Sequence, residues 1–336
     1  MNLNSKELIS LQEVLLDWYF KNGRLDLPWR NLRGQVPNPP AHLASIERSY
    51  GVYISEIMLQ QTQVNVVLDR FFFPFLERFP SLQSLANSQE EEVLKLWQGL
   101  GYYSRARNLR KSAILCQSQF GGKLPDSRDK LKQLYGIGEY TSGAIACFGF
   151  GANVSFVDGN IARVISRLFA LPNASDKALQ EIAQKLLNPQ DPFNHNQALL
   201  DFGATLCTPK NPQCLLCPIQ SFCLGKAKPT LYPTPQKTTL IPLELYLGFF
   251  QEDKKISLVL SKERLYHGLY NPLFLEEVPP SSKALGSFKH HYTKYAIKAR
   301  VFLCEGKPPQ EAKFFSPEEI TKLPLSNLCK KALNLL

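Results

Sequence analysis

Residues 134–145 read Leu-Tyr-Gly-Ile-Gly-Glu-Tyr-Thr-Ser-Gly-Ala-Ile, and this stretch decides the fold of the central part of the chain. Gly136 and Gly138 are separated by one apolar residue, so the backbone can turn tightly between two apolar helical segments. The amides that such a turn exposes often meet a phosphate oxygen. A short Gly-Ile-Gly is also common in plain helix–helix turns, so this stretch alone leaves both interpretations open.

The sequence around this turn has the spacing of apolar residues that is typical of helices. From Leu8 to about Leu206, apolar residues recur every three or four positions, and Pro and Gly separate the segments. Residues Arg33–Ser49, with Gly34 and three prolines, predict an exposed loop that leads into a helix. Residues 226–242 hold four prolines and four threonines, which indicates a linker.

The C-terminal part has a different pattern. Its short apolar or alternating stretches predict strands at Leu243–Phe250, Ile256–Leu260 and Ala296–Leu303. Ser316–Leu323 predicts a helix capped by Ser316, with Pro317 in its first position. The sequence therefore predicts a large helical region followed by an α+β domain.

Length and charge limit the class of protein. The 336 residues are enough for two or three domains, each with a core of its own. Lys and Arg outnumber Asp and Glu by 39 to 29, which gives a net charge of +10. A basic field suits a polyanionic partner, although solubility alone is an equally ordinary reason for it.

Four cysteines lie close together near the end of the helical region. Their spacing is C-x6-C-x2-C-x5-C, and they are Cys207, Cys214, Cys217 and Cys223. Four thiolates on a short loop can ligate one compact metal centre, and zinc and a [4Fe–4S] cluster both accept four cysteines. The spacing alone does not choose between them. The other cysteines predict small core residues among apolar neighbours: Cys116, Cys147, Cys304 and Cys329.

Two carboxylates are candidates for catalysis. Glu56 lies in an apolar helical stretch, where a glutamate without a partner is unfavourable. A continuous helix there would align it with Gln60 and Gln63 along one face. Asp158 stands at the entrance to a helix, where an aspartate most often caps the helix. Two carboxylates in contrasting environments also suit glycosidic cleavage, in which one is a general acid and the other stays ionised beside a sugar cation.

Taken together, these motifs resemble those of the MutY-type adenine DNA glycosylases, within the endonuclease III-like, helix-hairpin-helix superfamily. In chain order the motifs are Ser-Glu-Ile-Met-Leu-Gln-Gln-Thr-Gln-Val at 55–64, Gly-Leu-Gly-Tyr-Tyr-Ser-Arg-Ala-Arg-Asn-Leu at 99–109, Val-Asp-Gly-Asn at 157–160 and the cysteine loop. The resemblance covers about Leu8 to Gly225 and, more loosely, the C-terminal part. It implies a mainly α fold: a helix-hairpin-helix glycosylase core with a [4Fe–4S] loop, followed by a C-terminal α+β, Nudix-like (MutT-like) domain.

The resemblance also implies domain boundaries and a cofactor. Residues 1–225 would form the helical catalytic region, with the helix-hairpin-helix subdomain at about 51–150. The N-terminal segment would join residues 151–225 in an iron–sulfur subdomain. Residues 226–242 would be the linker, and 243–336 the domain that recognises 8-oxoguanine. The resemblance favours one [4Fe–4S] cluster over zinc, in a structural role.

The resemblance assigns catalytic roles to single residues. Glu56 matches the glutamate that protonates adenine at N7. Asp158 matches the aspartate that stabilises the sugar cation, with Asn160 assisting. Endonuclease III-like lyases carry a nucleophilic lysine where this chain has Tyr140, so we expect a monofunctional enzyme that forms no Schiff base. Tyr140 can instead donate a hydrogen bond in the pocket.

Adenine is out of reach inside a stacked duplex, so the nucleotide must be extruded. The resemblance implies that Tyr102 wedges between bases and that Gln61 fills the gap near the opposite base. Without the resemblance, the stretch around Tyr102 is equally a basic helix face with a core tyrosine. The expected DNA contacts are Gln61, Tyr102, Arg105, Arg107, Gly136 and Gly138, and the expected adenine pocket includes Arg30 and Gln197.

The C-terminal domain carries one more motif. Phe288 and His290 match the family's Phe-Ser-His motif, but Lys289 replaces the serine. The resemblance implies that this motif recognises 8-oxoguanine opposite the adenine. A lysine is longer and charged, so we expect altered discrimination between 8-oxoguanine and guanine. Glu276 and Glu277 alone do not make a Nudix catalytic signature, so this domain should bind rather than hydrolyse.

The sequence therefore predicts a monofunctional adenine DNA glycosylase of base-excision repair, acting as a monomer on double-stranded DNA with A:8-oxoguanine or A:G mispairs. The alternatives are a bifunctional endonuclease III-type glycosylase/AP lyase and a non-catalytic DNA-binding protein. No run of eighteen apolar residues and no apolar segment near Met1 is present, so we expect no membrane partner and no secretion signal. In a bacterium, the protein would then be cytoplasmic, at the nucleoid.

Overall fold

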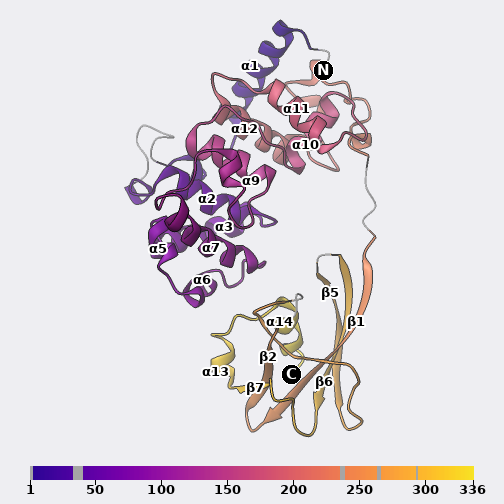
Figure 1. Cartoon of the computed structure of the whole chain (residues 1–336). Coiled ribbons are helices and arrows are strands. Elements are labelled where there is room, and N and C mark those ends of the chain that lie inside the picture. Colours follow the sequence, from indigo (N-terminus) through magenta and orange to yellow (C-terminus); the bar gives the residue numbers. More distant parts are fainter. Residues whose placement is uncertain (1–2, 33–40, 235–238, 263–265, 293) are drawn as a thin grey trace. The chain divides into compact units, whose positions relative to one another are not determined.

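The computed structural model describes residues 3–32, 41–234, 239–262, 266–292 and 294–336. The chain divides into two compact units, Met1–Gln236 and Lys237–Leu336, and the boundary falls within the predicted linker (Figure 1). Of the predicted loop Arg33–Ser49, residues 33–40 lie outside the described residues. Among the helices described, none is both long and apolar enough to cross a membrane.

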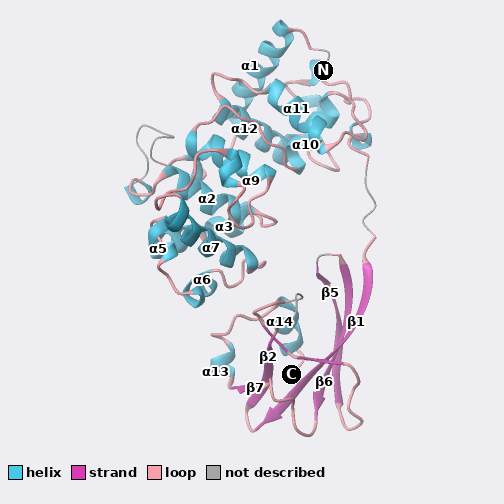
Figure 2. Cartoon of the chain, in the orientation of Figure 1, coloured by secondary structure: helices cyan, strands magenta, loops and turns pink. Residues whose placement is uncertain are grey.

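The first unit is helical, as the sequence predicts (Figure 2). Its α-helices are α1 (Ser5–Asn22), α2 (Arg48–Leu59), α3 (Val64–Arg70), α4 (Phe72–Arg78), α5 (Leu82–Ala86), α6 (Glu90–Leu96), α7 (Ser104–Gln119), α8 (Arg128–Leu131), α9 (Glu139–Ala144), α10 (Gly159–Leu168), α11 (Asp176–Leu186) and α12 (Pro192–Asp201). Short helical turns that bear on the site are η1 (Pro28–Arg30), η3 (Ile145–Gly149) and η4 (Phe202–Leu206).

Helix α1 packs against the part of the chain that follows α10. Its apolar face buries Leu11, Leu15 and Tyr19. The buried Gln12 side chain donates to the carbonyls of Leu186 (2.9 Å) and Leu187 (3.2 Å), which are exposed by the end of α11. The N-terminal segment is therefore fixed to residues about 175 positions further along the chain.

Helix α2 lies in the middle of the first unit. All its residues from Ser49 to Met58 are buried, which fits its apolar sequence. The predicted alignment of Glu56, Gln60 and Gln63 along one helix face is wrong, because α2 ends at Leu59 and α3 begins only at Val64. The intervening turn contains Gln61 in the left-handed conformation, with φ of 57°.

The predicted turn at Gly136–Gly138 is confirmed, and it joins α8 to α9. Gly136 has φ of 76°, and a Cβ atom there would lie 2.8 Å from the Asn108 amide nitrogen. Only glycine fits both the conformation and the close approach. Gly138 precedes α9 as its N-cap, with nothing within 4 Å of the position of a Cβ atom.

The second unit is a mixed sheet with two helices. Its elements are β1 (Ile241–Glu252), β2 (Lys255–Leu260), β3 (Tyr270–Asn271), β4 (Leu273–Leu275), β5 (Lys283–Tyr292), β6 (Tyr295–Cys304), β7 (Lys313–Phe315), α13 (Pro317–Ile320) and α14 (Asn327–Leu333). The strand order is β3-β2-β1-β6-β5, with β4 on β1 and β7 on β2. Strands β1 and β6 are parallel, and β5 pairs antiparallel with β6. This arrangement confirms the predicted α+β class and is consistent with a Nudix-like domain.

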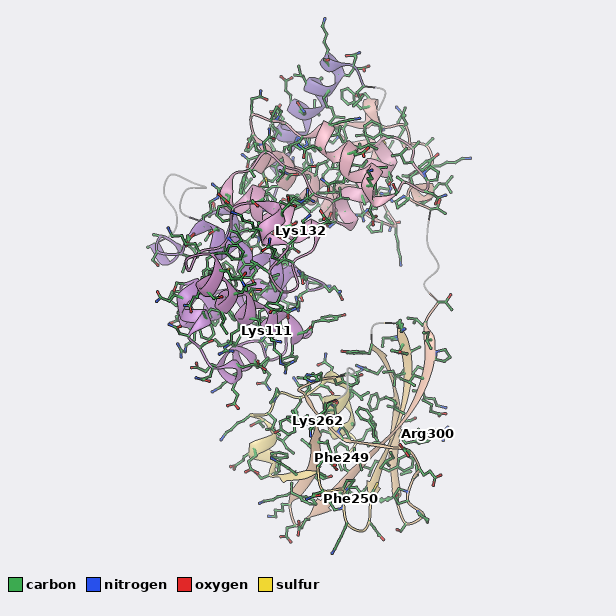
Figure 3. All side chains as sticks on the ribbon, in the orientation of Figure 1. Lys111, Lys132, Phe249, Phe250, Lys262 and Arg300 are labelled. Atoms are coloured by element: carbon green, nitrogen blue, oxygen red, sulfur yellow. The ribbon has the colours of Figure 1, made fainter. Side chains whose placement is uncertain are left out.

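The core of the second unit includes a continuous buried run of β1, from Leu247 to Phe250. Leu247 and Phe249 are fully buried on this strand, and Phe250 is nearly so. In Figure 3 the labelled Phe249 and Phe250 lie among the side chains that fill this unit. The predicted cap Ser316 is confirmed, since it forms a reciprocal capping box with Glu319 at the start of α13.

The residues Phe288, Lys289 and His290 lie in strand β5. They face Ala299, Lys298 and Ile297 of β6. Because side chains alternate along a strand, Phe288 and His290 point to one face and Lys289 to the other. His290 is buried and Lys289 is exposed, so the three residues do not form a single contact surface.

Candidate active site and iron–sulfur loop

The predicted catalytic residues meet at one cavity of about 570 Å³ in the first unit. Its lining includes every residue that the sequence assigned to catalysis or to the adenine pocket, namely Arg30, Glu56, Tyr140, Asp158, Asn160 and Gln197. They come from η1, α2, α9, the start of α10 and α12. The volume lies in the range of pockets that enclose a small organic molecule.

Glu56 is the most perturbed acid of this cavity. It is 7% exposed, and burial raises the pKa of its carboxyl from 4.5 to about 7. A hydrogen bond from the Tyr140 hydroxyl and the charge of Arg30 lower this pKa, whereas the nearby Asp158 carboxylate raises it. Glu56 can therefore hold or release a proton near neutral pH, as a general acid must.

Asp158 is the N-cap of α10, as its position in the sequence suggested, and it also lines the cavity. Its Oδ1 caps α10 by accepting from the Ile161 amide (2.7 Å), and its Oδ2 accepts from the Asn160 side chain (2.8 Å). Burial raises the pKa of Asp158, while these two hydrogen bonds oppose that shift by favouring the ionised form. Their donors fix the direction of the carboxylate at the wall of the cavity.

Sequence reasoning missed one buried carboxylate that organises the cavity. Asp201, at the end of α12, has no exposed surface, and it accepts from Arg30 Nη1 (2.7 Å) and Nη2 (2.9 Å). Arg24 donates its backbone N–H to the same carboxylate (2.8 Å) and its Nε as well (2.9 Å). These arginines hold the pKa of Asp201 below its ordinary value against the effect of burial. Asp201 stands in an apolar stretch of the sequence, directly before Phe202. The same feature, a carboxylate among apolar residues, identified Glu56 and could have identified Asp201.

Tyr102 and Gln61 are exposed residues in unusual backbone conformations. Tyr102 is 44% exposed with φ of 48°, in a turn flanked by Gly99 and Gly101, and Gln61 has φ of 57°. Gln63 and Thr62, beside Gln61, line the cavity. The structure thus presents both side chains to solvent, as the predicted DNA contacts require.

The prediction that Arg105 contacts DNA phosphate is wrong for the protein in this structure. Arg105 is 7% exposed, and its guanidinium donates to carbonyls of the α2 terminus and of the Gly101 turn. Arg107 is half-buried, with its Nε paired to Glu90 (2.9 Å). Because Arg105 points into the protein and the charge of Arg107 is paired with Glu90, these two arginines contribute little to the basic face that the sequence suggested.

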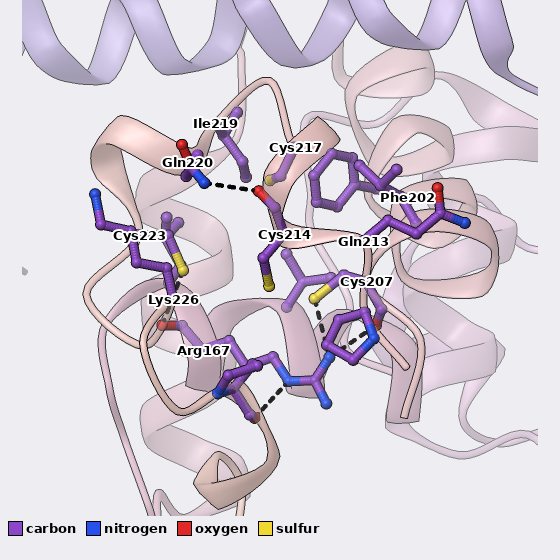
Figure 4. A pocket seen from close by; sticks show the side chains of 15 residues that line it. Arg167, Phe202, Cys207, Gln213, Cys214, Cys217, Ile219, Gln220, Cys223 and Lys226 are labelled. Carbon is purple, nitrogen blue, oxygen red and sulfur yellow. Dashed lines mark hydrogen bonds between the residues drawn. The ribbon is translucent and has the colours of Figure 1, made fainter. Parts of the chain in front are cut away.

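The four cysteines line a separate cavity in the first unit (Figure 4). Burial raises the pKa of Cys217 to about 12 and also raises the pKa of Cys223, and the other cysteines add to both shifts. No group of three or more His, Cys, Asp or Glu among the described residues is close enough to hold a single metal ion. The donor set of four thiols around one space fits a [4Fe–4S] cluster, and Cys207, Cys214, Cys217 and Cys223 would hold it.

Two arginines of α10 hold the cysteine loop through backbone carbonyls. Arg167 is 3% exposed and donates to Thr208 (2.7 Å), Pro209 (2.9 Å) and the Cys207 sulfur (3.3 Å). Arg163 donates to the carbonyl of Cys207 (2.9 Å) and to the Asn160 side-chain oxygen (2.9 Å). The loop and the Asn160–Asp158 pair are thus tied to the same helix.

Two family models match the chain. Residues 54–189 match the HhH-GPD superfamily of base excision DNA repair proteins, and residues 207–223 match the iron–sulfur binding domain of endonuclease III. The first range includes Glu56 and Asp158, and the second begins at Cys207 and ends at Cys223. The predicted helix-hairpin-helix core and the iron–sulfur loop are both confirmed by these matches.

Several curated relatives of the chain are named adenine DNA glycosylase. An adenine DNA glycosylase of Buchnera aphidicola subsp. Baizongia pistaciae is 35% identical, over 78% of this chain and 72% of its own length. The chain belongs to the adenine DNA glycosylase family. A mouse member of this family is 42% identical over 65% of this chain, and a human member is 40% identical over 66%. The matched part spans only 42% of the mouse protein and 40% of the human protein.

Solved structures of other DNA glycosylases share the fold of the first unit. A thermostable thymine-DNA glycosylase is 28% identical, with a TM-score of 0.59, and the match covers 66% of this chain and 98% of that chain. An endonuclease III in a non-covalent DNA complex has a TM-score of 0.54 over 67% of this chain and 98% of its own. At 20% identity, the latter shows a shared fold only.

The raised pKa of Glu56 predicts how stability depends on pH. Folding raises this pKa from 4.5 to about 7, so the folded state binds the extra proton between these values. The contribution of Glu56 to the free energy of unfolding is therefore lost as the pH rises from 4.5 to about 7. Glu56→Gln should stabilise the protein by about 2–3 kcal/mol at pH 8 and by much less at pH 4.

Urea unfolding of the parent and Glu56→Gln proteins at both pH values measures this difference. Glu181→Gln, on α11, is the control, because it neutralises a glutamate outside the cavity lining. An equal effect of Glu56→Gln at both pH values contradicts a perturbed Glu56.

The cysteine loop predicts the metal content of the protein. Protein purified without oxygen should be brown and contain about four irons per chain, because four thiolates ligate one [4Fe–4S] cluster. Cys217→Ser should lose iron, whereas Cys304→Ser, in the buried core of the second unit, should keep it. Iron analysis and the visible spectrum measure this outcome. Stoichiometric zinc without iron would show that the cluster assignment is incorrect.

Proposed function

We propose that the chain is a monofunctional adenine DNA glycosylase of base-excision repair. It hydrolyses the N-glycosidic bond of adenine mispaired with 8-oxoguanine or guanine in double-stranded DNA, and acts as a monomer. The observation that carries the proposal is the pairing of Glu56 with Asp158 in one cavity. Glu56 has a pKa of about 7, and Asp158 is held by two hydrogen bonds. The family membership of the chain supports the same activity.

The geometry supports a two-carboxylate mechanism. Protonated Glu56 donates its proton to N7 of the extruded adenine, which makes the base a better leaving group. The bond between the sugar and N9 then breaks towards an oxocarbenium-like centre, and the Asp158 carboxylate stabilises that positive charge. Water adds to the sugar carbon, so the products are free adenine and an abasic site. Glu56 accepts the proton that this water releases and is ready for the next cycle.

Other residues of the cavity orient the base. Arg30 and Gln197 are buried and line the cavity, so their polar atoms are suited to the edges of adenine. Asp201 fixes Arg30 with two hydrogen bonds, which keeps the guanidinium from closing on Glu56. Tyr140 supports the ionised state of Glu56 after proton transfer through its hydrogen bond.

A lyase activity would need a nucleophile that this chain does not have at position 140. A lyase of the endonuclease III type uses a lysine amine to form a Schiff base, and this chain has Tyr140 there. Burial and the neighbouring carboxylates raise the pKa of the Tyr140 hydroxyl far above neutral pH. The hydroxyl stays protonated and is a hydrogen-bond donor, which supports hydrolysis by water.

A single assay of base release tests this function. Duplexes with A:8-oxoguanine, A:G and an oxidised pyrimidine are each incubated with excess protein, and free base and strand nicking are measured with and without alkali. We expect adenine release from the first two duplexes, nicking only after alkali, and no covalent complex with borohydride. Glu56→Gln should lower the single-turnover rate at least about 10²-fold while binding survives. Release of the pyrimidine with trapping by borohydride would instead establish the lyase.

The positions of Phe288, Lys289 and His290 on β5 predict how their variants change the preference for 8-oxoguanine over guanine opposite the adenine. Lys289 is exposed and attracts phosphate irrespective of sequence, so Lys289→Ser should weaken binding to undamaged DNA and lessen its salt dependence. Phe288→Ala and His290→Ala change the opposite face, and each should reduce the preference for 8-oxoguanine over guanine by about 1–3 kcal/mol.

Affinities for both mispairs at two salt concentrations measure these effects. Lys313→Ser, on β7, is the control for loss of one exposed charge. The same preference in all three β5 variants means that this strand does not read the opposite base.

A further inference from the structure

Two turns of the first unit share an unusual backbone feature. Gln61, after α2, has φ of 57°, and Tyr102, before α7, has φ of 48°. Both are left-handed conformations, which residues other than glycine seldom adopt and which persist only where the surroundings enforce them. Both side chains are exposed, so the strain does not serve to bury them. The structure must therefore contain a contact that holds each turn.

One buried guanidinium makes that contact for both turns. Arg105 Nη1 donates to the carbonyls of Ile57 (2.8 Å), Met58 (2.9 Å) and Gln60 (2.6 Å), at the C-terminal end of α2. The carbonyls of Ile57 and Met58 belong to the last turn of α2, which stops at Leu59, where the regular pairing of helix carbonyls ends. The positive charge also suits the negative end of the helix dipole.

The other nitrogen of the same group reaches the second turn. Arg105 Nη2 donates to the carbonyls of Leu100 (3.3 Å) and Gly101 (3.2 Å), the two residues before Tyr102. It also donates to the Thr62 hydroxyl (3.2 Å), immediately after Gln61. The Tyr102 ring lies 5.5 Å from the Arg105 guanidinium carbon, and the Trp97 ring lies 5.3 Å from it on an adjoining segment.

We propose that Arg105 is a positioning residue that ties the Gln61 turn and the Tyr102 turn into one unit, so that both side chains enter a DNA duplex in a fixed mutual arrangement. This inference rests on the proposed function, in which Gln61 and Tyr102 are the residues that enter the duplex. Arg105 itself does not touch the DNA. It acts through the backbone of the two turns.

The chemistry of the contact explains why an arginine is needed. A guanidinium is a planar fork with N–H donors on two separate nitrogens, so one side can serve α2 while the other serves the Gly101 turn. A lysine keeps the charge but has a single nitrogen, which cannot reach both sets of acceptors. Burial lowers the pKa of Arg105 to about 10, so the group is still charged at neutral pH. The protein therefore keeps a buried cation at this junction, where backbone carbonyls are its partners.

Hydrogen exchange in the free protein tests the tie itself. In Arg105→Lys, amides of both peptides 57–63 and 98–104 should exchange about tenfold faster, because each turn loses the guanidinium hydrogen bonds that hold it closed. Thr62→Val removes one acceptor at the surface and should give a smaller effect of the same kind. Arg110→Lys is the matched control, because Arg110 lies on the same helix but donates to Ser88 (2.7 Å), away from both turns. Faster exchange in only one of the two peptides, or in neither, overturns the proposal.

A double-mutant cycle tests the consequence for DNA. In single-turnover adenine release, Arg105→Lys should slow the parent about tenfold but slow the Gln61→Ala/Tyr102→Ala variant by less than about twofold. A purely stabilising role of Arg105 predicts the same factor in both backgrounds, and that result would overturn the proposal. If the parent releases no adenine, the proposed function fails, and the hydrogen-exchange result alone still decides whether Arg105 ties the turns.

Discussion

Burial of the Glu56 carboxyl on α2 is the constraint on which the rest of the first unit depends. All residues of α2 from Ser49 to Met58 are buried, so the Glu56 carboxyl has few partners that stabilise a charge. The same burial that makes Glu56 unfavourable for folding gives it a pKa near neutral pH. Glu56 thus weakens the fold but is suited to proton transfer. Tyr140 and Arg30 lower its pKa, but they offset the effect of burial only in part.

Buried and half-buried arginines carry much of the arrangement around the cavity. Arg30, Arg105, Arg163 and Arg167 each direct a guanidinium inward, three of them mainly to backbone carbonyls of loops and helix ends. A planar group with five N–H donors can satisfy several carbonyls that no regular secondary structure pairs. The basic composition of the chain is therefore only partly a surface property. Some of the positive charge holds the turns around the cavity in place.

Much of the candidate site could be predicted from the sequence, because its residues lie in short motifs. Glu56 and Asp158 were identified from carboxylates in apolar or helix-entry positions, and the four cysteines from their spacing. The helical period and the Gly-Ile-Gly turn were enough for the class of fold. Arg105 was misread, because a basic residue near other basic residues gives no sign of which direction its side chain takes.

Short motifs were enough to name the candidate residues Glu56 and Asp158 and the cysteine loop, because residue type and spacing are local features of the sequence. Only the tertiary structure decided the end of α2 at Leu59, the pairing of Asp201 with Arg30 and the inward direction of Arg105. Each of these depends on partners that are far apart in the chain. The elements that pack against a charged side chain decide whether it faces solvent or backbone carbonyls. The sequence around that residue does not contain this information.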